Sequence, residues 1–459
     1  MATQDRYFDY VVSGHSVASL VALKELQSKG CSVFWLRSPS PLGGVFWGRD
    51  YGELCFDRGM MLIEPTSFAV NQSSDVTTYD PNRRNDVARF SKLVDNYLRS
   101  IGIDCKQVLT PKMRVFDKVV DDLIISNRVS SLQNLPVSVT EIMRLELSEI
   151  ASGFAANPTL HASNKLNPSF DAVSFEAASI ANHGKVFHEI FIASFADKLG
   201  FTDLGKIPAK YHRSLWLPLF YPETLQCGLT GDNATLDATF FSYPARGSFR
   251  GVIEKLRPLQ KLPQADLADV KAIRKEVSDT RFIFNSGDIT TRRVIWGDRL
   301  GELLSLAGMT GEKPSRGSMA SFQIYYLTIP KSNLAYDFST VFVLDQSSRI
   351  FRVTDQSSCS QEAGDLSRLC VEVKEGGAES IDLGAELLKL GFIRSRSEIA
   401  LIGFENAQLP FPGFSEMASA KRIFDKMQEY YPFTFLGHAA APGTGSFNDQ
   451  IVQGLSAAN

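Results

Sequence analysis

The sequence lacks the features that mark several common functional classes. Its six cysteines are scattered through 459 residues, with no Cys-x-x-Cys pair and no histidine-cysteine cluster at metal-binding spacing. It has no run of lysine and arginine, and its net charge is −3, so a surface built for nucleic acid is not expected. No apolar segment is long enough to span a bilayer. These absences predict a cytoplasmic protein with reduced thiols, without bound metal, nucleic-acid partner or transmembrane segment.

Familiar catalytic motifs are also missing. The chain has no Ser-His-Asp spacing, nucleophile elbow or P-loop, so acyl and phosphoryl transfer gain no support. His183 and His188 are five positions apart, which does not suit a helical metal pair, and His183 is interpreted as a packing or capping residue. His212 and Arg213 are the only catalytic candidates, because they lie in an aromatic segment (211–223) expected to line or roof a cavity. An arginine there would hold a carboxylate or diphosphate, and a structural salt bridge is the equal alternative.

What the sequence does contain is a strand-turn-helix-strand pattern at its start. A β-branched run over 10–12 breaks at Gly14, and apolar residues then recur at helical spacing until Gly30. A second apolar run follows over 32–36. This order predicts a βαβ unit of the kind that opens a dinucleotide-binding domain.

The glycine pattern of that turn is incomplete. Dinucleotide-binding turns use three glycines, for the bend, for the approach of a pyrophosphate and for close helix-strand packing. Only Gly14 is present, and Ser16 and Ser19 take the other two places. Arg37 stands where an acidic residue would accept hydrogen bonds from a ribose. Because arginine cannot accept a hydrogen bond, it must meet a phosphate, stack on an adenine, or mark a site that holds the nucleotide differently.

A Gly43-Gly44 pair follows the second strand. Such a pair lets backbone lie close to a flat ligand and is typical of FAD sites rather than NAD sites, although a plain turn after Pro39 and Pro41 explains it equally well. Further on, apolar spacing predicts helices over 86–101, 137–151 and 170–199. Alternating β-branched and aromatic residues predict an antiparallel sheet from four strands, at 322–327, 340–344, 350–353 and 369–373. A helix is expected over 382–390, then a strand that stops at Gly437 and a terminal helix over 448–454.

The order of these motifs resembles a known superfamily. Leu-Gly-Gly follows the second strand, then come Phe-Asp-x-Gly at 56–59, Tyr-Pro-x-x-Gly-Ser at 243–248 and a terminal Phe-Leu-Gly, loop and helix. Together they resemble the amine oxidase and protoporphyrinogen oxidase-like flavoproteins, and within them the UDP-galactopyranose mutase branch. Asn448-Asp449-Gln450 is similar to the mutase segment that lies against the flavin.

The resemblance implies an α/β fold with a Rossmann-like FAD-binding domain in discontinuous segments and an inserted helical and antiparallel-sheet substrate domain. The expected boundaries are 1–75, 241–312 and 401–459 for the FAD-binding parts, 76–240 for the helical insertion and 313–400 for the sheet. The implied cofactor-binding residues are Gly14, Ser16, Ser19, Arg37, Gly43, Gly44, Gly59, Met60, Gly437, His438, Asn448, Asp449, Gln450 and Ile451. His438 stands where the superfamily usually has an acidic residue or, in the mutases, an arginine.

Three functional hypotheses follow. The first is an FAD-dependent oxidoreductase or mutase-like enzyme that acts on a small polar metabolite such as a nucleotide sugar, in glycan or specialised-metabolite biosynthesis. The second, motivated by Ser16, Ser19 and Arg37, is a flavoprotein-like scaffold that has lost FAD and acts as a binding or regulatory subunit. The third is NADP binding, in which Arg37 meets a 2′-phosphate, and the Gly43-Gly44 pair argues against it.

Overall fold

The computed structural model describes residues 6–64, 75–78, 90–153, 160–162, 168–201, 203–232, 240–258, 261–309, 319–361, 363–376, 381–410, 413–431, 433–437 and 445–459. His438 lies outside these residues, and the side chain of Arg213 is not described. No helix of the described chain is long and apolar enough to cross a membrane.

The N-terminal βαβ unit is present. Strand β1 (Arg6–Ser13) pairs in parallel with β2 (Val33–Arg37), and helix α1 (Val17–Ser28) connects them. Helix α1 begins where the Ser16 hydroxyl accepts a hydrogen bond from the Ser19 amide, and the chain turns out of it at Gly30, whose φ is 75°. The leucines, valines and alanines of α1 are buried, so packing rather than propensity holds this helix.

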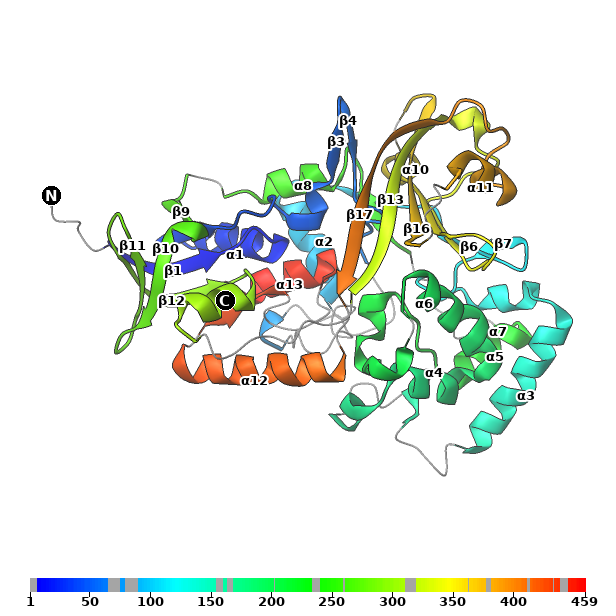
Figure 1. Ribbon diagram of the computed structural model, residues 1–459, viewed down its shortest axis with the longest axis horizontal. Coiled ribbons are helices and arrows are strands. Elements are labelled where there is room, and N and C mark those ends of the chain that lie inside the picture. The colour runs from blue at the N-terminus through cyan, green and yellow to red at the C-terminus, as the bar shows by residue number, and fades with distance from the viewer. Residues whose placement is uncertain are drawn as a thin grey trace.

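β1 is central to a seven-stranded sheet whose order is β10-β11-β12-β1-β2-β9, with β18 paired to β12. The later strands are β9 (Gln264–Asp266), β10 (Val270–Lys275), β11 (Thr280–Phe284), β12 (Ile289–Trp296) and β18 (Thr434–Phe435). Helices α1, α8 (Phe249–Leu256) and α13 (Phe447–Ala457) contribute to the core on one face, and α9 (Leu300–Leu306) and α12 (Phe414–Tyr430) to the core on the other. This three-layer module occupies the left half of Figure 1.

A second seven-stranded sheet, ordered β17-β13-β16-β15-β14-β6-β7, stands beside that module (Figure 1). Its strands are β6 (Lys112–Val115), β7 (Lys118–Asp121), β13 (Met319–Pro330), β14 (Thr340–Val343), β15 (Ile350–Asp355), β16 (Leu366–Lys374) and β17 (Ala400–Pro410). Helix α11 (Leu383–Lys389) packs on one face through Leu383 and Leu387. Short hairpin strands β3 (Arg49–Tyr51) and β4 (Leu54–Phe56) lie against the other face, where Tyr51 contacts Gly403.

Helices gather below this sheet in Figure 1. They are α3 (Val137–Gly153), α4 (Phe175–His183), α5 (Lys185–Phe187), a π-helical turn (His188–Ala193), α6 (Ser194–Lys198) and α7 (Pro222–Thr230). The remaining elements lie elsewhere. Helix α2 (Ser91–Ser100) packs against α13, strands β5 (Cys105–Gln107) and β8 (Ser242–Pro244) pair with each other, and α10 spans Gln356–Ser360.

The expected helix over 170–199 is divided at Gly184, whose φ is 80°.

The four predicted antiparallel strands, the helix over 382–390 and the terminal helix are all present. The structure differs from the expected domain boundaries in two places. Strand β17 lies in the expected third FAD-binding part, 401–459, but it pairs with β13 along its length and therefore belongs to the second sheet. Strands β6 and β7 join the same sheet from within the segment expected to be mainly helical.

Lys198 joins the helices to the second sheet. Its side chain is buried, and its Nζ donates hydrogen bonds to the carbonyl oxygens of Val343 and Ile350, both at 2.9 Å, and of Asp345. These carbonyls flank the turn between β14 and β15. The three carbonyl acceptors replace the hydrogen bonds to water that the ammonium group loses on burial, which offsets its cost of desolvation.

We expect Lys198→Met to lower the free energy of unfolding by about 2–5 kcal/mol, because it leaves buried carbonyl groups without a donor. Urea unfolding followed by circular dichroism measures the change. The control is Lys185→Met, which removes an exposed lysine with one ion-pair partner, Glu189, and should cost less than about 0.5 kcal/mol. Equal effects of the two substitutions would contradict this role for Lys198.

Candidate functional site

The turn after β1 is built from Gly14, Ser16 and Ser19. Gly14 has a φ of 101°, and a Cβ atom there would stand 3.0 Å from the carbonyl carbon of Gly297. Ser16 caps α1, and the buried Ser19 hydroxyl donates to the Ser13 carbonyl oxygen at 3.0 Å. Ser19 therefore takes the helix-strand packing place of the third glycine, and its hydroxyl is engaged within the protein rather than directed at a pyrophosphate.

Side-chain amides of α13 hold three separate segments around this turn. Gln450 Oε1 accepts a hydrogen bond from the Val17 amide at 3.0 Å, and Asn448 Oδ1 accepts one from the Glu64 amide at 3.1 Å. Gln453 Oε1 accepts from the Gly437 amide at 2.7 Å. The structure thus brings the predicted residues Asn448, Gln450 and Gly437 together with the α1 turn.

Helix α13 also packs tightly on α1. A Cβ atom on Gly454 would stand 2.5 Å from the Ala18 carbonyl oxygen, so only glycine permits this approach. Ile451 is fully buried, while the Asp449 amide donates to the Ser446 hydroxyl that caps α13. Of these two predicted residues, Ile451 thus packs in the core and Asp449 takes part in the N-terminal cap of α13.

Arg37 pairs with Asp266 on the neighbouring strand β9. The two residues are register partners, and Arg37 Nη2 lies 2.7 Å from Asp266 Oδ1. Sequence reasoning missed Asp266, because the chain returns to this sheet edge more than two hundred residues later. An acidic residue thus stands beside Arg37 on the neighbouring strand, and the charge of Arg37 is balanced within the protein.

His15 and Asp298 complete the end of the first sheet. His15 lies edge-on to Trp35, and its Nδ1 lies 2.7 Å from the Ser40 carbonyl oxygen. Trp35 in turn donates from Nε1 to the Gly14 carbonyl oxygen at 3.0 Å. Burial raises the pKa of Asp298, with hydrogen bonds from Ser38 and Ser13 opposing the shift. Neither His15 nor Asp298 was predicted.

The predicted flavin-side glycines differ in their surroundings. Gly43 packs on Ile253, where a Cβ atom would come within 2.7 Å of the side chain, whereas a Cβ atom on Gly44 would meet nothing within 4 Å. Gly59 lies under the carboxylate of Glu372, and Met60 is buried in the core. Of these glycines, Gly43 and Gly59 are enclosed by side chains, whereas Gly44 adjoins open space.

A buried carboxyl group links two of the motifs. Asp57 accepts a hydrogen bond from the Tyr243 hydroxyl and one at 3.3 Å from the Phe249 amide at the start of α8. Burial raises the pKa of Asp57 to about 6, although these donors favour the ionised form. The Phe-Asp-x-Gly and Tyr-Pro-x-x-Gly-Ser segments thus meet directly, which the sequence did not indicate.

Two further ionic groups lie where the sheet meets the first module. Arg352 donates to Glu372 through Nε at 2.5 Å and Nη2 at 2.6 Å, and both side chains are buried. Glu405 of β17 accepts from Arg49 and Arg58, and from the Tyr326 hydroxyl at 2.5 Å. The face of the sheet turned toward Gly59 is therefore rich in arginine and carboxylate.

The histidines of the helical part have structural surroundings. His183 is fully buried, its Nε2 accepts a hydrogen bond from the Phe220 amide at 2.8 Å, and burial lowers its pKa to about 3. His212 is also buried, with Nδ1 at 2.9 Å from the Leu217 carbonyl oxygen. The aromatic segment around His212 contributes Leu215, Leu217 and Phe220 to the core. This segment was expected to line or roof a cavity, and most of its described side chains instead pack in the interior, with Tyr221 and Glu223 exposed.

The residues around the α1 turn fit a polar dinucleotide. Within the described chain, five buried side-chain atoms here have no hydrogen-bond partner: His15 Nε2, Arg37 Nε, Asp298 Oδ2, Asn448 Nδ2 and Gln453 Nε2. Buried polar atoms are normally paired, so the donors of Arg37, Asn448 and Gln453 suit the acceptors of a nucleotide, and His15 Nε2 suits one of its hydroxyl groups. A Cβ atom on Gly44 would stand in open space.

The fold is similar to the folds of solved structures that include a UDP-galactopyranose mutase and a putrescine oxidase. A crystal structure of reduced UDP-galactopyranose mutase superposes with a TM-score of 0.66 at 14% identity, covering 98% of this chain and 93% of that chain. A putrescine oxidase variant made for redesign of cofactor binding gives 0.57 at 13% identity, covering 99% of this chain and 98% of that one. A CLA-producing fatty acid isomerase from P. acnes gives 0.55 at 12% identity, covering 97% and 96%. Neither protein-family models nor curated protein sequences match the chain. The predicted mixed α/β fold of sheets and helices is confirmed, and at these identities the likeness concerns the fold alone.

We expect Tyr243→Phe to lower the free energy of unfolding by about 1–3 kcal/mol at neutral pH, because a buried carboxylate loses a donor. The folded pKa of Asp57 is raised, so lowering the pH protonates this group more readily in the folded state than in the unfolded one. The loss should therefore shrink as the pH falls below about 6. Urea unfolding over a pH series measures it.

The matched control is Tyr336→Phe. The Tyr336 hydroxyl is buried without a hydrogen-bond partner in the described chain, so its removal should not lower stability. A pH-independent loss in Tyr243→Phe would contradict the assigned role of the Tyr243–Asp57 pair.

Proposed function

We propose that this protein is a flavin-dependent enzyme, an oxidoreductase or a mutase-like enzyme, that holds FAD between the α1 turn and α13. The observation that carries the proposal is that three segments meet at the α1 turn. The Gly43 amide donates to the His15 carbonyl oxygen at 2.7 Å, and Gln450 accepts from the Val17 amide at 3.0 Å. Buried polar atoms of His15 and Arg37 at this turn have no partner within the described chain. The resemblance of the motifs and the flavoprotein fold support it. When bound, a flavin supplies electron-transfer chemistry that amino-acid side chains lack.

In this proposal the chain's own residues position and enclose the cofactor. The side-chain amides of Asn448 and Gln453 would donate to its polar half, His15 Nε2 would accept a hydrogen bond from it, and Gly44 would leave room for its flat ring. Asp57 and Tyr243 hold α8 against the Gly59 segment, so they act as positioning residues.

The proposed substrate is a small polar metabolite, with a nucleotide sugar in glycan or specialised-metabolite biosynthesis as the particular candidate. Its support is the arginine-rich face of the second sheet beside Gly59. Arg352 is buried, and its Nη1 has no partner within the described chain, so one donor of a fixed guanidinium is available there. Arginine in this setting suits phosphate oxygens.

The alternative is a scaffold that has lost FAD and serves as a binding or regulatory subunit. The observation that favours it is that polar groups where a dinucleotide would bind already have partners within the protein. Gln450 accepts a hydrogen bond from the Val17 amide, and Asp266 pairs with Arg37. The same Arg37–Asp266 pair argues against NADP, because the carboxylate would repel a 2′-phosphate.

The test is the absorbance spectrum of the natively purified protein, with FAD titration by calorimetry. The enzyme proposal expects a flavin spectrum and saturable FAD binding. Absence of both would overturn it and favour the scaffold.

A pair of glycine substitutions locates the cofactor. Gly44 and Gly52 have φ values of 61° and 62°, and a Cβ atom at either would meet nothing within 4 Å. Asparagine tolerates this backbone conformation, so both Asn variants should fold. We expect Gly44→Asn to weaken FAD binding at least about 10-fold, while Gly52→Asn in the β3–β4 turn changes it less than about twofold. Equal affinities in the two variants would place the flavin elsewhere.

A further inference from the structure

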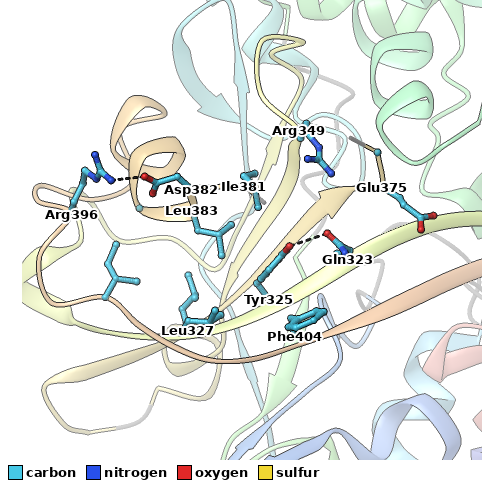
Figure 2. A pocket seen from close by; sticks show the side chains of 14 residues that line it. Gln323, Tyr325, Leu327, Arg349, Glu375, Ile381, Asp382, Leu383, Arg396 and Phe404 are labelled. Atoms are coloured by element: carbon cyan, nitrogen blue, oxygen red, sulfur yellow. Dashed lines mark hydrogen bonds and ion pairs between the residues drawn. The ribbon is translucent and has the colours of Figure 1, made fainter. Parts of the chain in front are cut away.

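A hollow of about 820 Å³ lies on the outer face of the second sheet, between β13, β17 and α11 (Figure 2). Successive strand residues point to opposite faces, so Tyr325 and Leu327 face this hollow while Tyr326 faces the first module. The hollow is therefore separated from the proposed flavin site by the sheet itself. Its volume is in the range of small-molecule sites.

Two stacked aromatic rings form part of the lining. Tyr325 and Phe404 are register partners on β13 and β17, with ring centroids 5.8 Å apart and planes inclined by 26°. Phe404 remains 57% exposed although it is a large apolar side chain. The Tyr325 hydroxyl donates to Gln323 Oε1 at 2.9 Å, which fixes the ring (Figure 2). The result is an exposed aromatic surface, called here the aromatic platform, formed by Phe404 stacked on Tyr325 with polar groups at its edge.

The remaining polar lining consists of two cations and two carboxylates: Arg349, Arg396, Glu375 and Asp382. Arg396 and Asp382 form an ion pair at 2.5 Å, and Arg349 donates through Nε and Nη2 to the Lys374 carbonyl oxygen. The lining has no net charge, so it does not select an anion or a cation. It offers planar donors and acceptors around the platform, which suits a ligand with many hydroxyl groups.

We propose that this hollow binds a short neutral glycan, with the apolar face of a sugar ring on Phe404 and its hydroxyl groups on the planar side chains of the rim. Sugar rings combine a C–H face with hydroxyl edges, and the hollow presents the complementary surfaces. A fatty acid would leave the charged rim unused, and an extended peptide would need the edge of β17 rather than the face over α11. The site stands independently of flavin binding.

The experiment is saturation-transfer NMR of the full-length protein with maltotriose, cellotriose, mannotriose, galactotriose and chitotriose, followed by calorimetry with any that bind. At least one should bind, and Phe404→Ala should weaken that binding at least about 10-fold, while Phe404→Trp retains it. Binding should change little between low and high salt, because no net charge is involved. The matched control is Tyr430→Ala, which removes an exposed aromatic side chain from α12 and should leave binding unchanged.

Gly44→Asn should also bind the glycan normally, so that failure of flavin binding and failure of this site are distinguishable. Thermal unfolding of Phe404→Ala should match that of the unaltered protein, since the ring is more than half exposed. The proposal is overturned if no glycan of the panel binds, or if binding survives Phe404→Ala. It is also overturned if octanoate or a peptide binds the hollow in place of all the glycans.

Discussion

The first module depends on the contact between α1 and α13. These helices come from opposite ends of the chain, and the absence of a side chain at Gly454 lets them approach closely. Three amide side chains of α13 then accept hydrogen bonds from the backbone of α1, of the segment after β4 and of the segment after β18. Because backbone amides at such ends have no helical or sheet partner of their own, one helix satisfies and positions all of them.

A second constraint operates where the module meets the antiparallel sheet. Asp57, the Arg352–Glu372 pair and Glu405 with its two arginines lie along this junction, and each of the three carboxylates has several donors. Buried charges gain little stability over apolar packing, but their geometry penalises any other alignment. We infer that these ionic groups fix the orientation of the second sheet over Gly59. They thereby also set the width of the space between the sheet and the first module.

The sequence predicted those parts of the fold whose pattern is local. The βαβ unit, the four antiparallel strands and α13 follow from periodicity and from glycine at turns. Helix α12 was not predicted, because it buries only Ile423 and Met427 and its apolar pattern is correspondingly weak. The interactions of Asp266, Asp57 and Lys198 could not be predicted from the sequence, for a different reason. Each depends on partners supplied by distant segments, and no local spacing encodes such pairs.

The connection order of the first sheet has a consequence for biosynthesis. Strand β1 pairs with β12, and the α1 turn is completed by α13, whose Gln450 lies 433 positions after Val17. Contacts so distant along the chain form late, because loop closure must precede them. Until α13 has been synthesised, the N-terminal turn lacks the partner that completes it. The proposed cofactor site is therefore assembled late, and before then the apolar face of α1 would depend on chaperones for shielding.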